Sequence, residues 1–150
     1  MYLVGRDPGL VAGVGKVVRR FGGGFWVREV RAWRPVVSEF RSHGGAVAHL
    51  TMYGEHLDDV QARLRRIAVE RDLLLVVGAE KVPAEVYLEA DFNVAVANQP
   101  HSEVAALAIF LDRLQDGGGL HHGFPGARVR ILPNLRGKSV EGGDAGPGVR

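Results

Sequence analysis

The residues best suited to chemistry gather in one short polar segment, between an alternating apolar stretch and an unbroken apolar run. It reads Asn98-Gln99-Pro100-His101-Ser102-Glu103. Two amides, an imidazole, a hydroxyl and a carboxylate can together hold a polar ligand, and the imidazole can carry a proton near neutral pH. The segment is therefore a candidate binding corner, and His101 is its candidate proton carrier or helix-start hydrogen-bonding group.

A predicted strand and a predicted helix would position these side chains. Phe92–Val96 alternates apolar with small or polar residues, as a strand does. Pro100 ends the strand, and Ser102 is a favourable N-cap for a helix that begins at Glu103. In an open parallel sheet, such a corner lies at the carboxyl end of a strand, where folds of this kind bind ligands.

Two further predicted loops could reach the same sheet edge. The apolar runs Ala46–Leu50 and Leu73–Val77 indicate buried strands, and the second is typical of the middle of a parallel sheet covered on both faces. Thr51–Gly54 follows the first strand and Gly78–Val82 follows the second. The glycine that opens the second loop allows a ligand to approach the backbone closely. The glutamates of this loop and of the corner could bind a ligand, or could be exposed acids at helix starts.

The order of predicted elements indicates an α/β fold, with a mostly parallel sheet and helices on both faces. Further strands are predicted at Tyr2–Val4, Phe25–Val30 and Ala127–Leu132, and helices from Pro8 to about Gly22, and over Pro35–Phe40, Leu57–Glu70, Pro83–Ala90 and Glu103–Leu114. We expect one domain over residues 1–138. Its loop from Gln115 to Gly126 is glycine-rich, and residues 139–150 form a flexible glycine-rich tail.

The last predicted helix has no polar face for more than two turns. Val104–Leu111 is a run of eight apolar residues, far shorter than the roughly 20 needed to cross a bilayer. A helix that is apolar all round is buried in the core or against a partner subunit. We therefore expect a homodimer formed through this helix.

The composition of the chain excludes some classes of site and indicates where the protein is located. The 150 residues contain no cysteine, so disulfides and thiolate metal sites are excluded. The six histidines show no metal-binding spacing, and no metal site is predicted. The sequence shows neither a signal-peptide pattern nor an apolar run of membrane-spanning length, which favours a cytoplasmic protein without a membrane partner.

Positive charge is concentrated in the first third of the chain. Residues 1–45 carry eight Lys/Arg and three Asp/Glu, whereas the remainder carries 11 and 14. A basic region of this kind suits a polyanion such as nucleic acid, although a solvated surface would have the same composition. Arg28, Arg31 and Arg34 interleave with Trp26 and Trp33, a combination that suits RNA, but core packing is the favoured interpretation of the two tryptophans.

Two motifs carry a family resemblance. Gly78-Ala79-Glu80-Lys81-Val82-Pro83, followed by Asn98-Gln99-Pro100-His101-Ser102-Glu103-Val104-Ala105-Ala106-Leu107-Ala108, resembles the archaeal tRNA cytidine-56 2′-O-methyltransferase family, a branch of the knotted SPOUT methyltransferases. The similarity extends from about Ala46, through His49-Leu50-Thr51-Met52-Tyr53-Gly54, to Pro133 and Arg136-Gly137-Lys138.

The resemblance implies a trefoil-knotted α/β domain, a homodimer, and S-adenosyl-L-methionine held by three loops. The implied reaction moves a methyl group to the 2′-hydroxyl of a cytidine, position 56 in the T loop of tRNA. The implied cofactor contacts are Leu50, Gly78, Ala79, Glu80, Lys81, Val82, Val96, Ala97, Asn98, Gln99, Pro100, His101, Ser102 and Glu103.

Members of this family begin with an additional strand and an arginine-rich segment, and this chain is expected to start after them. No catalytic residue is therefore assigned. A non-catalytic, knotted RNA-binding homodimer is the alternative function, and an α/β nucleotide-binding module is a third.

Overall fold

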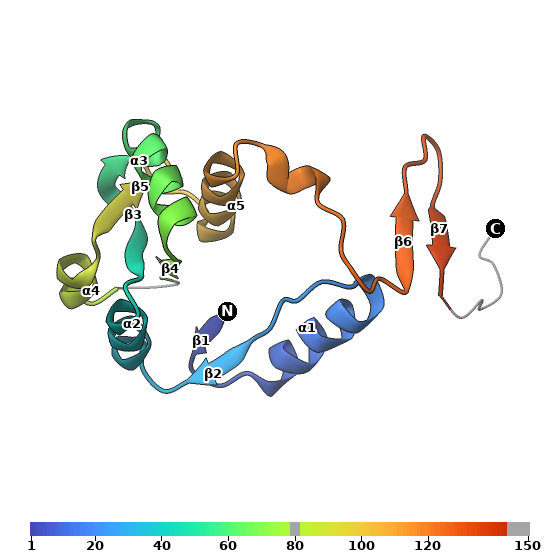
Figure 1. Ribbon diagram of the computed structural model, residues 1–150, viewed down its shortest axis with the longest axis horizontal. Coiled ribbons are helices and arrows are strands. Elements are labelled where there is room, and N and C mark those ends of the chain that lie inside the picture. Colours follow the sequence, from blue (N-terminus) through green and yellow to red (C-terminus); the bar gives the residue numbers. More distant parts are fainter. Residues whose placement is uncertain (79–81, 144–150) are drawn as a thin grey trace. The chain divides into compact units, whose positions relative to one another are not determined.

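The computed structural model describes residues 1–78 and 82–143, which fall into two compact units. One is Arg34–His122, and the other is Met1–Trp33 together with Gly123–Arg150. Figure 1 shows the helices and strands of each unit. The prediction of one domain over residues 1–138 stays a prediction, because two compact units can belong to one domain.

A three-stranded parallel sheet forms the centre of the Arg34–His122 unit. Its order is β4 (Leu73–Val77), β3 (Ala46–His56), β5 (Phe92–Ala95), so β3 is the central strand. The first five residues of β3 are all buried, whereas β4 is half-buried at the edge of this described sheet. The prediction that β4 lies in the middle of the sheet is wrong. Its continuous apolar run arises in an edge strand that packs partly against the core.

Four α-helices and a short 3-10 turn accompany the described sheet, and the sequence predicted each of the four α-helices. They are α2 (Trp33–Ser42), α3 (Leu57–Glu70), α4 (Ala84–Glu89), α5 (Glu103–Leu114) and the 3-10 turn η1 (Gly118–His121). The bounds of α3 and α5 are those predicted, and the Ser102 hydroxyl accepts a hydrogen bond from the Ala105 amide, as an N-cap does. Among the described residues, no helix has the length and apolarity that crossing a membrane requires.

The hydrophobic core lies between one face of the sheet and helices α3 and α5. Phe110 of α5 and Leu64 of α3 are fully buried there, with Ala48 and Val94 of the strands. Burying a phenylalanine, leucine or valine side chain stabilises a fold by roughly 1.5–3 kcal/mol. This packing holds α3 and α5 against the sheet, so the first turn of α5 has a defined position at the end of the sheet.

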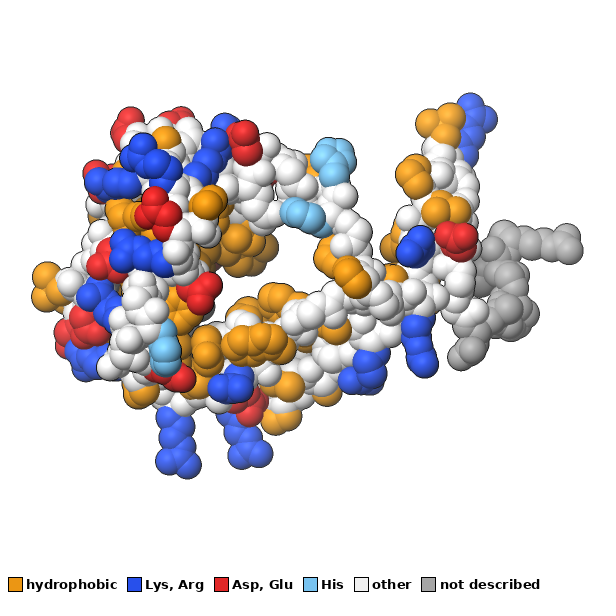
Figure 2. Space-filling model, viewed as in Figure 1, with side chains coloured by type: hydrophobic (Ala, Val, Ile, Leu, Met, Phe, Trp, Pro, Cys, Tyr) orange, Lys and Arg blue, Asp and Glu red, His pale blue; other side chains and the backbone are white. Residues whose placement is uncertain are grey.

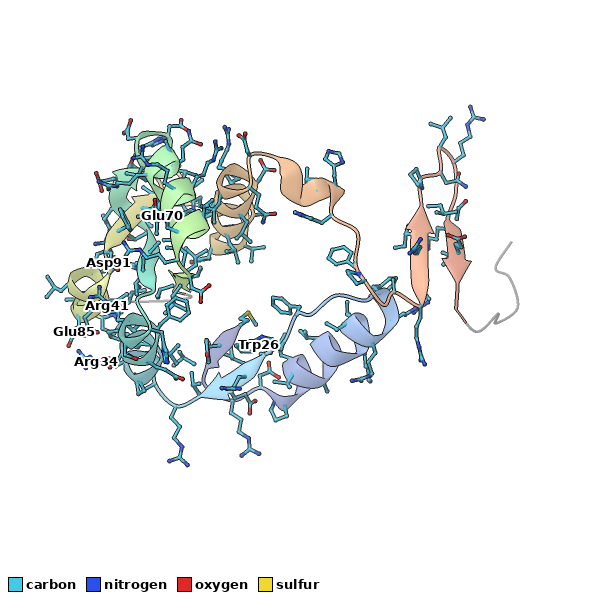
Figure 3. The ribbon with its side chains drawn as sticks, in the orientation of Figure 1. Trp26, Arg34, Arg41, Glu70, Glu85 and Asp91 are labelled. Atoms are coloured by element: carbon cyan, nitrogen blue, oxygen red, sulfur yellow. The ribbon has the colours of Figure 1, made fainter. Side chains whose placement is uncertain are left out.

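Ion pairs and hydrogen bonds attach α2 to α4 and to the start of β5 (Figure 3). The Arg41 guanidinium donates to the Glu89 carbonyl at 2.6 Å and to the Asp91 carboxylate at 2.9 Å. The other Asp91 oxygen accepts from the Val47 amide at 2.8 Å. Arg34 pairs with two acids of α4, Glu85 and Glu89, and its hydrogen bond to Glu89 raises the pKa of the guanidinium.

The other unit contains two small sheets and one helix. Its elements are β1 (Tyr2–Val4), α1 (Pro8–Phe21), β2 (Arg28–Val30), β6 (Val129–Leu132) and β7 (Ser139–Gly142). Strands β1 and β2 are parallel, whereas β6 and β7 pair antiparallel. Trp26 is about half exposed, packs edge-on against Tyr2 and lies beneath the Arg28 guanidinium, so its predicted core position is wrong.

The C-terminal prediction needs correction over part of its length. Residues 139–142, predicted to be tail, form strand β7 because their backbone pairs with β6. Residues 144–150 lie outside the described residues. The ribbon of Figure 1 shows this hairpin in orange and red.

Candidate functional site

A bulge in β3 forms one wall of the candidate site. Leu50 and Glu55 both pair with Val94 of β5, so residues 51–54 are extra in the ladder. A Cβ on Gly54 would overlap the backbone of Asn93 and Val94, so only glycine permits this approach. Residues 51–54, predicted as a loop, are therefore part of a strand, in a conformation that depends on β5.

Asn98 holds this bulge in place from the other side of the corner. Its side-chain amide donates to the Met52 carbonyl at 2.8 Å and to the Gly54 carbonyl at 3.2 Å. The predicted binding corner after β5 and the bulge of β3 are thus joined by a single side chain. Asn98 therefore positions the segments on both sides of the site.

A cavity of about 460 Å³ lies at the carboxyl end of the three parallel strands. This is the volume of a small-molecule site, and the location is the one at which parallel sheets bind ligands. Its walls are apolar and carry a few polar groups. It is lined by His49, Leu50, Thr51, Met52, Tyr53, Val77, Gly78, Val82, Tyr87, Val94, Val96, His101, Glu103 and Ala106.

The structure brings six of the fourteen predicted cofactor residues to this cavity. They are Leu50, Gly78, Val82, Val96, His101 and Glu103. Ser102 caps α5, and Asn98 holds the bulge. Ala97, Gln99 and Pro100 belong to the same corner but are not among the lining residues. Ala79, Glu80 and Lys81 lie outside the described residues.

A buried histidine on β3 is the polar group that the sequence did not single out. His49 is fully buried, and its Nδ1 lies 2.9 Å from the side-chain oxygen of Asn93 on β5. The Tyr87 ring packs edge-on against the imidazole at 4.7 Å between centroids. The Tyr87 hydroxyl in turn lies 3.0 Å from the Thr51 hydroxyl. His49, Thr51 and Tyr87 all line the cavity.

Hydrogen bonding determines the tautomer of His49. The Asn93 amide nitrogen donates to the Tyr87 carbonyl at 2.9 Å, so its oxygen must face the imidazole. His49 Nδ1 therefore carries the proton and donates to that oxygen, which leaves Nε2 as an acceptor. Burial lowers the pKa of His49, and the bond to Asn93 opposes this effect only in part. The imidazole is thus neutral at physiological pH.

The acceptor nitrogen of His49 has no hydrogen-bond partner among the described residues. A buried polar atom without a partner costs about 1–3 kcal/mol, and a ligand donor or a bound water would remove that cost. His49 lines the apolar cavity together with the polar residues Glu103 and His101. The arrangement suits a ligand that has both an apolar ring and hydrogen-bond donors. Only the alternation of β3 could have indicated His49, since it places this side chain on the face opposite Leu50.

Comparison with known proteins identifies the family. Residues 21–141 match the family model described as "Trm56: tRNA ribose 2'-O-methyltransferase, aTrm56". A solved structure with some likeness is the SpoU methyltransferase AviRb from Streptomyces viridochromogenes in complex with AdoMet, with a TM-score of 0.44 at 15% identity, over 62% of this chain and 37% of that one.

Three relatives are each named tRNA (cytidine(56)-2'-O)-methyltransferase. The Methanopyrus kandleri protein is 53% identical over 135 residues, 90% of this chain and 74% of the relative. The Pyrococcus abyssi protein is 55% identical over 83% of this chain and 62% of its own length, and the Methanoregula boonei protein is 49% identical over 94% and 78%. The chain belongs to the Trm56 family of tRNA ribose 2′-O-methyltransferases.

Proposed function

We propose that this chain transfers a methyl group from S-adenosyl-L-methionine to the ribose 2′-hydroxyl of cytidine 56 in the T loop of tRNA. One observation carries the proposal beyond family membership. The cavity at the carboxyl end of the sheet is lined by residues of all three segments that the resemblance implies for the cofactor, namely Leu50, Gly78 with Val82, and Val96 with His101 and Glu103.

The residues of the cavity fit this cofactor chemically. When bound, S-adenosyl-L-methionine supplies an electrophilic methyl group on a sulfonium centre. Leu50, Val94 and Val96 offer apolar surface suited to an adenine ring. The Glu103 carboxylate and the neutral His49 acceptor suit hydroxyl or ammonium donors. The chain therefore orients the reacting groups, which is the main requirement when the methyl group is already activated.

The proposed reaction exchanges one bond to the methyl group for another. The sulfur–methyl bond breaks as the ribose oxygen–methyl bond forms, and the 2′-hydroxyl proton passes to a base. No described residue is assigned as that base. His101 lines the cavity and remains the candidate proton carrier predicted from the sequence.

A homodimer through α5 and a trefoil knot, both implied by the resemblance, belong to the same proposal. The exposure of the apolar residues of α5 supports the dimer. Ala106 and Phe110 are buried, whereas Val104 is 77% exposed and Ile109 and Leu111 are also exposed. An apolar helix face of this kind suits a protein interface. A cytoplasmic location follows from the proposed tRNA substrate.

The experiment that tests the function is transfer of radiolabelled methyl groups to unmodified tRNA. We expect label in the T loop, and none in a tRNA whose cytidine 56 carries a 2′-deoxyribose. Cofactor binding without any transfer would contradict the proposal. Binding of tRNA with no measurable cofactor affinity would instead support the non-catalytic RNA-binding homodimer.

The part of Glu103 is tested by Glu103→Gln, which keeps the shape of the side chain and removes its charge. Losing a charge-assisted hydrogen bond costs about 1.5–3 kcal/mol, so calorimetry should show roughly 10- to 100-fold weaker cofactor binding. Glu70→Gln, at an exposed residue at the end of α3, is the control and should leave the affinity unchanged. If the wild type, Glu103→Gln and Glu70→Gln bound the cofactor with equal affinity, Glu103 would not contact the cofactor.

A further inference from the structure

The two units carry opposite net charge. Residues 1–33 and 123–143 contain ten Lys/Arg and three Asp/Glu, a net charge of +7. Residues 34–122, which include the cavity, contain eight Lys/Arg and thirteen Asp/Glu, a net charge of −5. Figure 2 shows red and blue side chains mixed over the unit that contains α3, whereas blue predominates over the end of α1 and the base of β6. A polyanion would therefore be attracted to the unit that contains α1.

Within the basic unit, a groove of about 620 Å³ lies between the C-terminal end of α1 and β6. Of the six described residues that line it, four are cations: Lys16, Arg19, Arg20 and Arg128, with Val129 and Gly143 beside them. None of these four cations belongs to an ion pair within the described residues. Several like charges lining one groove repel one another, and an anion in the groove would relieve that repulsion.

Backbone hydrogen bonds hold the two sides of the groove together. The Arg128 amide donates to the Arg20 carbonyl at 3.0 Å, and the Gly23 amide donates to the Pro125 carbonyl at 3.0 Å. Gly22 has φ of +80°, and a Cβ there would lie 2.6 Å from the Pro125 carbonyl oxygen. Only glycine fits this junction. The cations of α1 and the cation that precedes β6 are therefore held together by the fold.

Helix stabilisation accounts for only part of this cluster. Arg19 and Arg20 lie in the last turn of α1, where cations offset the helix dipole by about 0.3–1 kcal/mol each. That role does not extend to Lys16, which lies before the last turn, or to Arg128, which belongs to another segment. Among the described residues that line the groove there is no aromatic side chain, so these residues offer contacts to phosphates and none for stacking on bases.

We propose that this basic groove, formed by Lys16, Arg19, Arg20 and Arg128, binds the sugar–phosphate backbone of RNA. The inference rests on the proposed function and names the surface that would hold the tRNA. Contacts of this type position an RNA without reading its sequence. The groove thus supplies affinity, while the cavity of the other unit carries the chemistry.

The test is the salt dependence of tRNA binding by the full chain, measured by fluorescence anisotropy between 50 and 300 mM salt. The variant Arg20→Gln/Arg128→Gln should weaken binding about tenfold at low salt and reduce the slope of log K against log salt by about 1.4–1.8, as expected for two lost phosphate contacts. Lys16→Gln, on the surface of α1, should reduce the slope by about half as much. An unchanged slope in both variants would overturn the proposal.

The matched control is Arg66→Gln/Arg71→Gln, which removes two exposed cations of the other unit. Its slope should equal that of the wild type, and a loss equal to that of the groove variant would show a nonspecific charge effect and overturn the proposal. Thermal unfolding and cofactor affinity, unchanged in both double variants, exclude misfolding. Inorganic phosphate at constant ionic strength should displace little tRNA, whereas full displacement at millimolar concentration would indicate a small-anion site instead.

The two proposals fail in different ways. If the wild-type chain binds tRNA through the groove and transfers no methyl group, the proposed function is wrong and the groove stands. If it methylates tRNA and the groove variants bind as the wild type does, the groove is wrong and the function stands.

Discussion

At the scale of single residues, His49 shows how packing determines the chemistry of a side chain. An exposed histidine exchanges its proton between two nitrogens, but Asn93 and the Tyr87 carbonyl leave His49 only one arrangement. The result is a neutral imidazole with a defined acceptor nitrogen, in a residue that lines the cavity. Nothing in the spacing of the six histidines distinguishes it, because its partners come from other elements.

The pH dependence of folding should report on this burial. Burial lowers the pKa of His49 from its ordinary value of 6.5, so the unfolded chain binds the proton more readily than the folded one. The stabilising contribution of the neutral imidazole is therefore complete above pH 6.5 and is lost as the pH falls below it. Urea unfolding should show a larger loss of stability between pH 7.5 and 5.5 for the wild type than for His49→Asn.

The His49→Asn variant keeps a donor for Asn93 but cannot titrate. Its stability at pH 7.5 should be lower by about 1–3 kcal/mol because it fills less of the site. His121→Asn, at an exposed residue of η1, controls for the loss of one histidine and should retain the wild-type pH dependence. A parallel loss in the wild type and in His49→Asn would mean that His49 is not the group that titrates.

At the scale of elements, local patterns predicted most of the fold. The helix predicted over Leu57–Glu70, the Ser102 cap of α5 and the apolar run of β4 have the bounds that the structure shows. These signals lie within each segment. The position of β4 in the sheet and the pairing of β7 do not, because both depend on which strand lies alongside.

The candidate site follows the same division. The polar corner Asn98–Glu103 was apparent from the sequence, and so was the glycine loop after β4. The bulge in β3 was not, because its extra residues are defined only by the register against Val94. Thr51, Met52 and Tyr53 were predicted as part of a loop that could reach this sheet edge, and the structure has them in the bulged strand that lines the cavity.

Gly54→Ala tests whether the bulge depends on this close approach. The new methyl group would overlap backbone atoms of Asn93 and Val94, and backbone of a central ladder cannot move aside cheaply. We expect a loss of about 3 kcal/mol in the free energy of unfolding, together with weaker cofactor binding. Chemical denaturation and calorimetry measure the two effects.

Gly13→Ala is the matched control for a glycine replaced by alanine. Gly13 lies inside α1, and a Cβ there meets no atom outside the local helix backbone within 4 Å. Alanine should stabilise the helix by roughly 0.5–1 kcal/mol. A Gly54→Ala protein as stable as the wild type would show that β3 can pair with β5 in another register.

At the scale of the whole molecule, the chain separates its tasks. The Arg34–His122 unit has the buried core and the cavity, and its charge is negative. The unit with α1 has net positive charge and a groove of cations. A unit of net negative charge gains little from RNA phosphates, so an enzyme of this composition needs the cations of its other unit to supply the affinity. Methyl transfer to tRNA should accordingly fall steeply with salt, whereas cofactor binding should not.

The proposed homodimer also belongs to the whole molecule, and substitutions in α5 can test it. Leu111 is 39% exposed on the apolar outer side of the helix, so an aspartate there remains solvated in a monomer. In the proposed dimer the same aspartate would be buried without a partner, at a cost of several kcal/mol. Leu111→Asp should therefore be a folded monomer by light scattering, with the wild-type circular dichroism spectrum.

Phe110→Ala is the matched control and should give the opposite result, because Phe110 is fully buried within one chain. Its free energy of unfolding should fall by about 3–5 kcal/mol, while the folded fraction still dimerises. A wild-type protein that is monomeric at every concentration would leave the exposed face of α5 without its proposed partner.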